Sequence, residues 1–391
     1  MSRPVRCVIM RGGTSKAVFL READLPLDGD ERLRTILAIF GSPDPRQIDG
    51  LGGADPLTSK VAVIGPPRIG NPRAANTHLT YTFGQVEIRS PEIDYVSLCG
   101  NISSAVGAFA VYEGLVEPTE PITIVRAYNT NLDRVLTLEV PVKGNRPLEC
   151  GDYGVPGVPG TGARILVDLA DTAGGATGSL LPTGNAVDRL DVPDFGAIEA
   201  SLLDIGNAHV FVRARDVGLT GTETAAEIDS RADLRDRLER IRAAGAHRMR
   251  MISDVTRSRE ESPAAPILGI VSPPADYRND IAGTTIAAAE SDVVSRLMFM
   301  QQTHKTYAGT STVCTGVASR IPGTVVHEAT RPETRDCEQV RIGHPAGVIE
   351  TLTRVERVGD MYMVRRATLG RTARRIMEGY VFVPDASGTP A

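Results

Sequence analysis

The chain has 391 residues and a formal net charge of −5 at pH 7, from 43 Lys and Arg against 48 Asp and Glu. This length suits about two domains, and a hydrophobic content of 41% is enough to give each of them a core. The small negative charge argues against nucleic acid or an anionic membrane as the partner, and an aromatic content of 4% without any Trp weakens a base-stacking role further.

The first predicted element is a strand that ends at Met10 and leads into a glycine-rich turn, Arg11–Lys16 (RGGTSK). Backbone N–H groups and hydroxyls in such a turn suit the binding of an anion. The turn lacks the GK[ST] ending of a nucleotide-binding loop. A purely structural turn is equally consistent with the pattern.

Lys60 follows a second glycine-rich stretch and directly precedes the apolar run 61–64 (VAVI). Burying a lysine is costly unless it is paired or neutral. Because burial favours the free amine, such a lysine can act as a base. The alternative is an ordinary exposed lysine at the start of a strand.

Hydrophobic periodicity predicts strands and helices along the rest of the chain. Alternating apolar residues predict short strands, and apolar residues three or four apart predict helices. The predicted strands lie near 79–88, 136–142 and 165–169, and the predicted helices span 222–246 and 290–304.

A composition shift predicts where the chain divides. Residues 151–185 are dense in Gly, Thr and Pro, and the strand pattern starts afresh after Asn185. We therefore expect an N-terminal domain over 1–185 and a C-terminal domain over 186–391, with a last strand near 376–387 that returns to the first domain.

A weak internal echo links the two parts. Cys99 in CGNISSAVGAFA and Cys314 in CTGVASR each precede a small-residue stretch that can start a buried helix. The aligned amides at a helix N-terminus favour a thiolate and can also hold a carboxylate. These two cysteines are therefore candidates for proton transfer, whereas Cys7, Cys150 and Cys337 are interpreted as small buried hydrophobic residues.

Two further segments offer groups that bind anions. The segment Asp204–His209 (DIGNAH) places Gly-Asn before a strand, and Arg371, Arg374 and Arg375 would share one face of a helix. A solvated basic face is the alternative for the arginines.

Cysteine and histidine spacing gives no sign of a metal site. The sequence has no CxxC and no HExxH motif, and no run of 18 apolar residues. We expect a cytoplasmic protein that needs no metal and has no nucleic-acid or membrane partner, with homo-oligomerisation left open.

Several motifs together resemble the methylaconitate isomerase family of diaminopimelate-epimerase-like proteins, over about Arg11–Val383. They are RGGTSK, GSPDPRQIDGLGGADPLTSK, CGNISSAVG, HKTYAGTSTVCTG, RIGHPAG and RTARRIMEG. Stretches such as SRLMFMQQTHKTYAG are most similar to the methylitaconate isomerase branch. The chain departs from the family in having no Pro after Gly206-Asn207 and in an insert, GPPRIGNPRAAN, expected on the surface.

The resemblance implies an α/β (α+β) fold of two pseudo-symmetric domains, each a curved, mostly antiparallel sheet around a central helix, with the active site in the cleft between them. It also implies a cofactor-independent isomerase that moves a proton or double bond in an unsaturated di- or tricarboxylic acid of the methylitaconate, 2-methylaconitate or 4-oxalomesaconate type. The family's catalytic motifs fall on Lys60 as the base and Cys99 as the acid, with Cys314 as a second acid or part of the binding wall.

Within that reading, small polar groups are expected to bind the substrate. The amides of Gly100, Asn101, Thr315 and Gly316 would stabilise developing charge, and the side chains of Thr14, Ser15, Ser103 and Asn207 would bind carboxylates.

Two alternatives stay open. One is an amino-acid epimerase or racemase that uses Cys99 and Cys314 as a thiol pair, against which Lys60 in its TSK context argues. The other is a polycarboxylate-binding protein that has kept the site and lost the chemistry.

Overall fold

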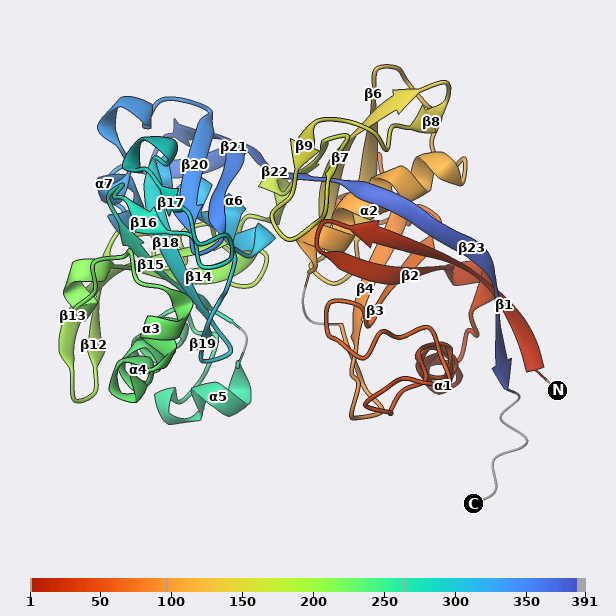
Figure 1. The fold of residues 1–391 in the computed structure, drawn as a ribbon, viewed down its shortest axis with the longest axis horizontal. Helices are drawn as coiled ribbons and strands as arrows, with labels where there is room; N and C mark the ends of the chain where they lie inside the picture. Colours follow the sequence, from red (N-terminus) through yellow and green to blue (C-terminus); the bar gives the residue numbers. More distant parts are fainter. Residues whose placement is uncertain (1, 96–97, 264, 385–391) are drawn as a thin grey trace. The chain divides into compact units, whose positions relative to one another are not determined.

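The computed structural model describes residues 2–95, 98–263 and 265–384 (Figure 1). The chain forms two compact units: unit 1 comprises Met1–Val167 with Gly370–Ala391, and unit 2 comprises Asp168–Leu369. The sequence predicted a division after Asn185. The structure places the first boundary after Val167, so residues 168–185 belong to unit 2. The strands β11 (Ile165–Asp168) and β22 (Met361–Arg371) run from one unit into the other.

Unit 1 contains strands of the large sheet, one separate pair of short strands and two α-helices. Its elements are β1 (Ser2–Gly12), β2 (Ser15–Arg21), η1 (Glu22–Asp24), α1 (Gly29–Phe40), β3 (Lys60–Gly65), η2 (Pro72–Ala74), β4 (Leu79–Val86), β5 (Ile93–Asp94), α2 (Gly100–Tyr112), β6 (Ile122–Asn129), β7 (Arg134–Lys143), β8 (Arg146–Pro147), β9 (Tyr153–Gly154), β10 (Thr161–Gly162) and β23 (Ala373–Pro384).

The sheet of unit 1 surrounds helix α2. The neighbours β1 and β2 are antiparallel, β2 and β3 parallel, β3 and β4 antiparallel, β4 and β6 parallel, and β6 and β7 antiparallel. The last strand, β23, pairs antiparallel along β1, as expected from the sequence. Helix α2 contacts β1, β2, β4, β6, β7 and β23, and 11 of its 13 residues are buried. A helix buried on all sides is the centre of its domain rather than a surface cover.

Unit 2 has a larger number of short helices. Its elements are η3 (Ala170–Thr172), β12 (Asp188–Val192), β13 (Gly196–Ile205), β14 (Asn207–Arg213), η4 (Ala214–Val217), α3 (Ala225–Asp229), α4 (Ala232–Arg248), η5 (Val255–Arg257), α5 (Ser258–Glu261), β15 (Ile267–Ser272), β16 (Tyr277–Arg278), β17 (Thr285–Ile286), η6 (Ala288–Glu290), β18 (Val293–Phe299), β19 (Gln302–Thr303), α6 (Gly309–Ser319), α7 (Val325–Ala329), η7 (Pro332–Thr334), β20 (Gln339–His344) and β21 (Gly347–Val358).

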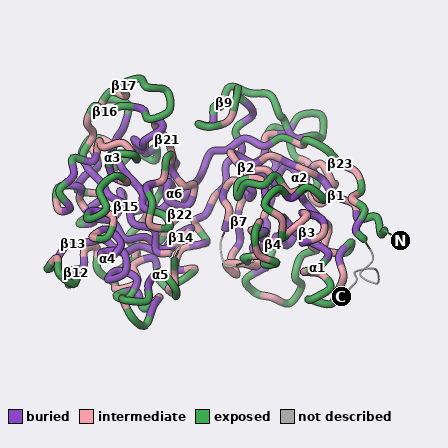
Figure 2. The backbone as a smooth tube through the Cα atoms, turned by 60° about the horizontal axis from the view of Figure 1, so that its bottom comes forward, coloured by how far each residue is buried: buried purple, intermediate pink, exposed green. Residues whose placement is uncertain are grey.

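The strand order of unit 2 repeats that of unit 1. The neighbours β13 and β14 are antiparallel, β14 and β15 parallel, β15 and β18 antiparallel, β18 and β20 parallel, and β20 and β21 antiparallel. Helix α4 lies between β14 and β15 in the chain as α1 lies between β2 and β3, and α6 corresponds in the same way to α2. The buried strands and the two central helices appear in purple in Figure 2. The predicted fold, two related halves each with a mostly antiparallel sheet around a central helix, is confirmed.

Several predicted elements are confirmed and three differ. The strands predicted near 79–88, 136–142 and 165–169 correspond to β4, β7 and β11. The helix predicted over 290–304 is wrong, because 293–298 form the fully buried part of strand β18. Val294, Leu297 and Met298 have the spacing of a helix, but a strand that is buried on both faces can carry apolar residues at the same positions. The helix predicted over 222–246 is interrupted between α3 and α4, and the arginines at 371–375 lie on strands β22 and β23 rather than on a helix.

The insert over 65–76 lies on the surface as expected, apart from the buried Ala74. In the described parts of the chain, no helix is long and apolar enough to cross a membrane.

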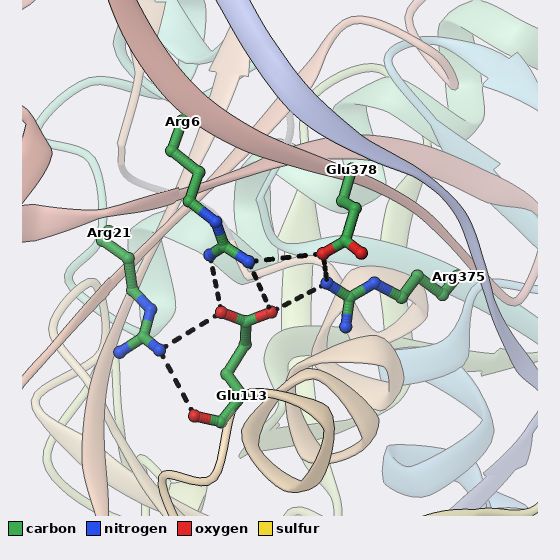
Figure 3. A network of polar contacts seen from close by, with 5 residues as sticks. All are labelled: Arg6, Arg21, Glu113, Arg375 and Glu378. Atoms are coloured by element: carbon green, nitrogen blue, oxygen red, sulfur yellow. Dashed lines mark hydrogen bonds and ion pairs between the residues drawn. The ribbon is translucent and has the colours of Figure 1, made fainter.

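A charge cluster fixes the C-terminal end of α2 to three strands of unit 1 (Figure 3). Glu113, the residue that caps α2, accepts hydrogen bonds from Arg6 on β1 at 2.6 Å, Arg375 on β23 at 2.8 Å and Arg21 on β2 at 3.3 Å. Glu378 also pairs with Arg6 and Arg375. A carboxylate at a helix C-terminus opposes the helix dipole, so the three guanidinium groups are what make this position favourable.

Acidification is expected to weaken unit 1 through Glu113. Burial raises the pKa of this carboxyl, but the bonds from Arg6, Arg21 and Arg375 outweigh it and lower the pKa from 4.5 to about 2. Because the folded-state pKa is the lower one, the stabilisation is present above about pH 4.5 and is lost as the pH falls toward 2. Glu113→Gln is expected to lower the free energy of unfolding at pH 7 by about 1–3 kcal/mol.

Urea unfolding at pH 7, 5, 4 and 3 measures both effects. Glu378→Gln is the matched control, because the Glu378 side chain is 59% exposed and its loss costs less. An equal loss of stability between pH 5 and pH 3 in wild type and Glu113→Gln would contradict this assignment.

Candidate active site

The turn between β1 and β2 packs onto the first turn of helix α2. Gly13 has φ +48°, and a Cβ there would lie 2.2 Å from Asn101 Oδ1, so both its conformation and the available space require glycine. The Asn101 side chain donates a hydrogen bond to Thr14 Oγ1 at 3.0 Å. The structure therefore brings together two of the predicted substrate-binding residues at one helix N-terminus.

Cys99 is the N-cap residue of helix α2, directly before Gly100. Its backbone is extended, its side chain makes no capping hydrogen bond, and it is partly exposed. Its carbonyl accepts hydrogen bonds from both the N–H and the hydroxyl of Ser103. The helix start is thus held by backbone carbonyl contacts, and the thiol is not used as a cap.

Two of the predicted carboxylate ligands are buried. The Ser103 hydroxyl is committed to the Cys99 carbonyl at 3.0 Å, and the Ser15 side chain is 2% exposed. We therefore place Ser103 in support of the helix start, and Thr14 is the more accessible hydroxyl of the β1–β2 turn.

Lys60 is buried at the start of strand β3 with neutral partners. The residue is 7% exposed, its Nζ donates to Gln85 Oε1, and it lies 5.3 Å from the centre of the Phe83 ring. The Gln85 amide nitrogen is itself bonded to the carbonyls of Ser59 and Pro56, which fixes the oxygen toward the lysine. Among the residues that the structure describes, no carboxylate forms an ion pair with Lys60. A buried amine without a counter-ion is the state that the sequence analysis required of a base.

One face of strand β4 connects Lys60 with Cys99. Tyr81, Phe83 and Gln85 alternate along β4 and so share a face, and Lys60 is the direct cross-strand neighbour of Gln85. Tyr81 is fully buried, and its pKa is raised by burial and by the proximity of Cys99. Because α2 packs against β4, Lys60 and Cys99 lie along the same face of that strand.

Unit 2 repeats the contact between a turn and a helix start. The β13–β14 turn contains Gly206, with φ +68°, and the side chain of Asn207 donates to Thr310 Oγ1 at 2.9 Å. Thr310 is the second residue of α6, as Asn101 is the second residue of α2. The predicted ligand Asn207 is therefore at the helix start of unit 2, with its amide bonded to Thr310.

Three comparisons place the chain among known proteins. Residues 2–384 match the family described as PrpF protein. The chain belongs to the PrpF family. It is 50% identical to the 3-methylitaconate isomerase of Eubacterium barkeri, over 98% of both chains, and 36% identical to the 2-methyl-aconitate isomerase of Shewanella oneidensis, over 97% of both. A crystal structure of methylitaconate-delta-isomerase is similar over the full length of both chains, with a TM-score of 0.91 and 48% identity.

A more distant similarity concerns the fold alone. A hydroxyproline epimerase from Agrobacterium vitis, 11% identical, matches with a TM-score of 0.52 over 99% of this chain and 94% of its own. This PrpF family chain is thus an isomerase with an epimerase-like fold. The alternative of a non-catalytic binding protein is set aside, because the similar full-length relatives are isomerases.

The helix position predicted for Cys314 in this PrpF family chain is wrong. Cys314 is the sixth residue of α6, fully buried, and burial raises the pKa of its thiol further than the bond from Ile205 lowers it. Thr315 and Gly316 follow it inside the helix, where their N–H groups belong to the helical hydrogen-bond ladder. The N-cap residue of α6 is Ala308, which occupies the position that Cys99 has at α2.

Two residues of the site, Gln85 and Tyr81, were not predicted from the sequence, and a third, Arg371, was predicted to bind an anion but was assigned to a helix instead of strand β22. Gln85 and Tyr81 flank Lys60 and Cys99 on β4, and Arg371 donates to Asn101 Oδ1 at 2.8 Å. The alternation of Tyr81, Phe83 and Gln85 was a usable signal for the first two. For the helix start of unit 2, the signal was the pairing of AGT at 308–310 with CGN at 99–101.

Metal ligands do not gather at this site. In the ranges that the structure covers, no group of three or more His, Cys, Asp or Glu side chains could hold a metal ion.

Proposed function

We propose that this isomerase moves a proton within an unsaturated di- or tricarboxylic acid, without a cofactor, using Lys60 as base and Cys99 as acid. The observation that carries the proposal is the buried Lys60 amine, which lies on the same face of β4 as the thiol that begins α2 and has only neutral partners. An amine that forms no ion pair can accept a proton from the substrate, and a thiol can return one.

The chemistry follows from the charge that these groups can support. The Lys60 amine removes a proton from a carbon next to the double bond or carboxylate, and the C–H electron pair spreads into a dienolate. Cys99 then delivers a proton to the allylic carbon, so the double bond moves and the net oxidation state is unchanged. The thiolate and ammonium that result exchange protons with water and return to their starting states.

The start of α2 can stabilise the intermediate. The first N–H groups of a helix have no partner within it, and the helix dipole adds a partial positive charge there. We assign the amides of Gly100 and Asn101 to the developing charge and Thr14 to a substrate carboxylate. Thr315, Gly316 and Cys314 receive no such role, because they lie inside α6.

The racemase alternative requires a second thiol at the equivalent helix start. Unit 2 has Ala308 at that position, which offers no proton donor. The full-length relatives at 50% and 36% identity support an acid of the methylitaconate or 2-methylaconitate type as the substrate.

Proton exchange in D₂O tests the reaction directly. The chain is incubated with methylitaconate, 2-methylaconitate, cis-aconitate and 4-oxalomesaconate in turn, and the products are followed by NMR. We expect deuterium at an allylic carbon and a shifted double bond, with methylitaconate the fastest of the four. An absence of exchange across the panel would refute the proposed function.

A further inference from the structure

Arg371 is a buried cation at the candidate active site. It ends strand β22, is 5% exposed, and was placed by sequence reasoning on the face of a helix that does not exist. Its Nε donates to Asn101 Oδ1 and its Nη1 donates to the carbonyl of Gly370, both at 2.8 Å. These two bonds fix the plane of the guanidinium against the start of α2.

Arg371 has no carboxylate partner in the described part of the chain. Burial lowers the pKa of its guanidinium to about 10, and only Tyr153 and Cys99 act in the opposite direction. By contrast, the buried Arg242 forms a two-point ion pair with Glu239 at 2.7 Å. Arg296, also buried, has the charges of Asp280 and Glu223 nearby. Arg371 therefore differs from both in having no carboxylate nearby among the described residues.

The surroundings of Arg371 are arranged to hold it in place. A Cβ at Gly13 would lie 2.9 Å from Arg371 Cδ, so the glycine of the β1–β2 turn leaves room for the side chain. Asn101 accepts from Arg371 with its oxygen and donates to Thr14 with its nitrogen. Arg371 Nη2 has no hydrogen-bond partner among the described residues. An uncompensated, oriented guanidinium edge is a site for a carboxylate.

We infer that Arg371 binds one carboxylate of the substrate at the start of α2, next to Cys99, and so makes the enzyme select a di- or tricarboxylate over a substrate that lacks this group. The inference rests on the proposed function, because it concerns the same site. A cation against the carboxylate of the reacting system also favours the dienolate, in which that group gains charge.

Binding measurements test this role without turnover. Methylsuccinate, which has no double bond to move, and its two monoamides are titrated calorimetrically into wild type, Arg371→Gln and Arg371→Lys. Arg374→Gln is the matched control, since it removes the same charge from an exposed residue of β23. We expect Arg371→Gln to bind methylsuccinate about 10–100-fold more weakly, the range for one charged hydrogen-bonded contact. The monoamide that lacks the carboxylate bound by Arg371 should bind wild type and Arg371→Gln with dissociation constants that agree within about twofold.

The outcomes separate this inference from the proposed function. Weaker methylsuccinate binding by Arg371→Gln, with no exchange in the D₂O panel, supports the carboxylate site and refutes the reaction. Exchange in the panel, with unchanged binding by Arg371→Gln, overturns the inference alone. If Arg371→Gln does not fold by circular dichroism, Arg371→Lys decides: it keeps the charge without the planar fork, and unchanged affinity would overturn the proposal. A wild type that binds no methylsuccinate also overturns it.

Discussion

Replacing Lys60 with Met is expected to lower kcat by about 10²–10⁴-fold while the fold is kept, since this is the range that a positioned acid or base contributes. Methionine is nearly the same length as the lysine stem, so the packing over Phe83 is retained. The amine and its hydrogen bond to Gln85 are lost, and the substrate proton then has no acceptor at that position. We therefore expect the loss in kcat rather than in KM.

The measurement is the rate of deuterium incorporation from D₂O, with the best substrate of the panel. Lys143→Met is the matched control, because it makes the same change of side chain at an exposed residue at the end of β7, outside the site. Lys60→Arg is a second variant, in which a permanently charged group fills the position. Turnover by Lys60→Met within about threefold of wild type would remove Lys60 from the mechanism.

The fold and one end of the candidate site were predictable from the sequence because their signals are local. The alternating apolar residues of β4 and β7 and the small residues after Cys99 each determine one element. Lys60 stood out because an apolar run follows it directly, and the structure buries it as that pattern predicted.

The errors arose where a local pattern has two physical readings. In the segment 293–298, the apolar residues Val294, Leu297 and Met298 fit the spacing of a helix. The pairing with β15 and β20 that makes this segment a strand depends on residues far away in the chain. The sequence comparison of the two halves matched Cys99 with Cys314. The structure aligns the two halves on the glycine that follows the helix cap, Gly100 in α2 and Gly309 in α6.

The position of Arg371 could not be obtained from the sequence. Its partner Asn101 is 270 residues away, and the contact exists only because β23 returns to pair with β1 in unit 1. No local pattern carries that information, since an arginine at the end of a strand is most often exposed.

Replacing Cys99 with Ala is the second change with a large expected effect, a loss of about 10²–10⁴-fold in kcat. The thiol makes no capping hydrogen bond to α2, and the contacts that hold the helix start come from the Cys99 carbonyl. Alanine preserves that carbonyl, so we expect little change in stability. The proton acceptor Lys60 remains in this variant. We therefore expect Cys99→Ala to lose less of its rate of deuterium exchange at the deprotonated carbon than of its rate of isomerisation.

Cys314→Ala is the informative comparison, because it removes a thiol from the interior of α6 rather than from a helix start. There we expect the reverse pattern: a stability loss of about 1 kcal/mol from the cavity, and kcat within about threefold of wild type. Cys337 and Cys150 were predicted to be buried, but the structure leaves both exposed. Cys337→Ala therefore controls for the loss of a thiol at the protein surface. Because Ala308 occupies the helix start of unit 2, one thiol should suffice for the reaction. Equal losses of kcat in Cys99→Ala and Cys314→Ala would instead require two thiols, and the mechanism with a single lysine and a single cysteine would be wrong.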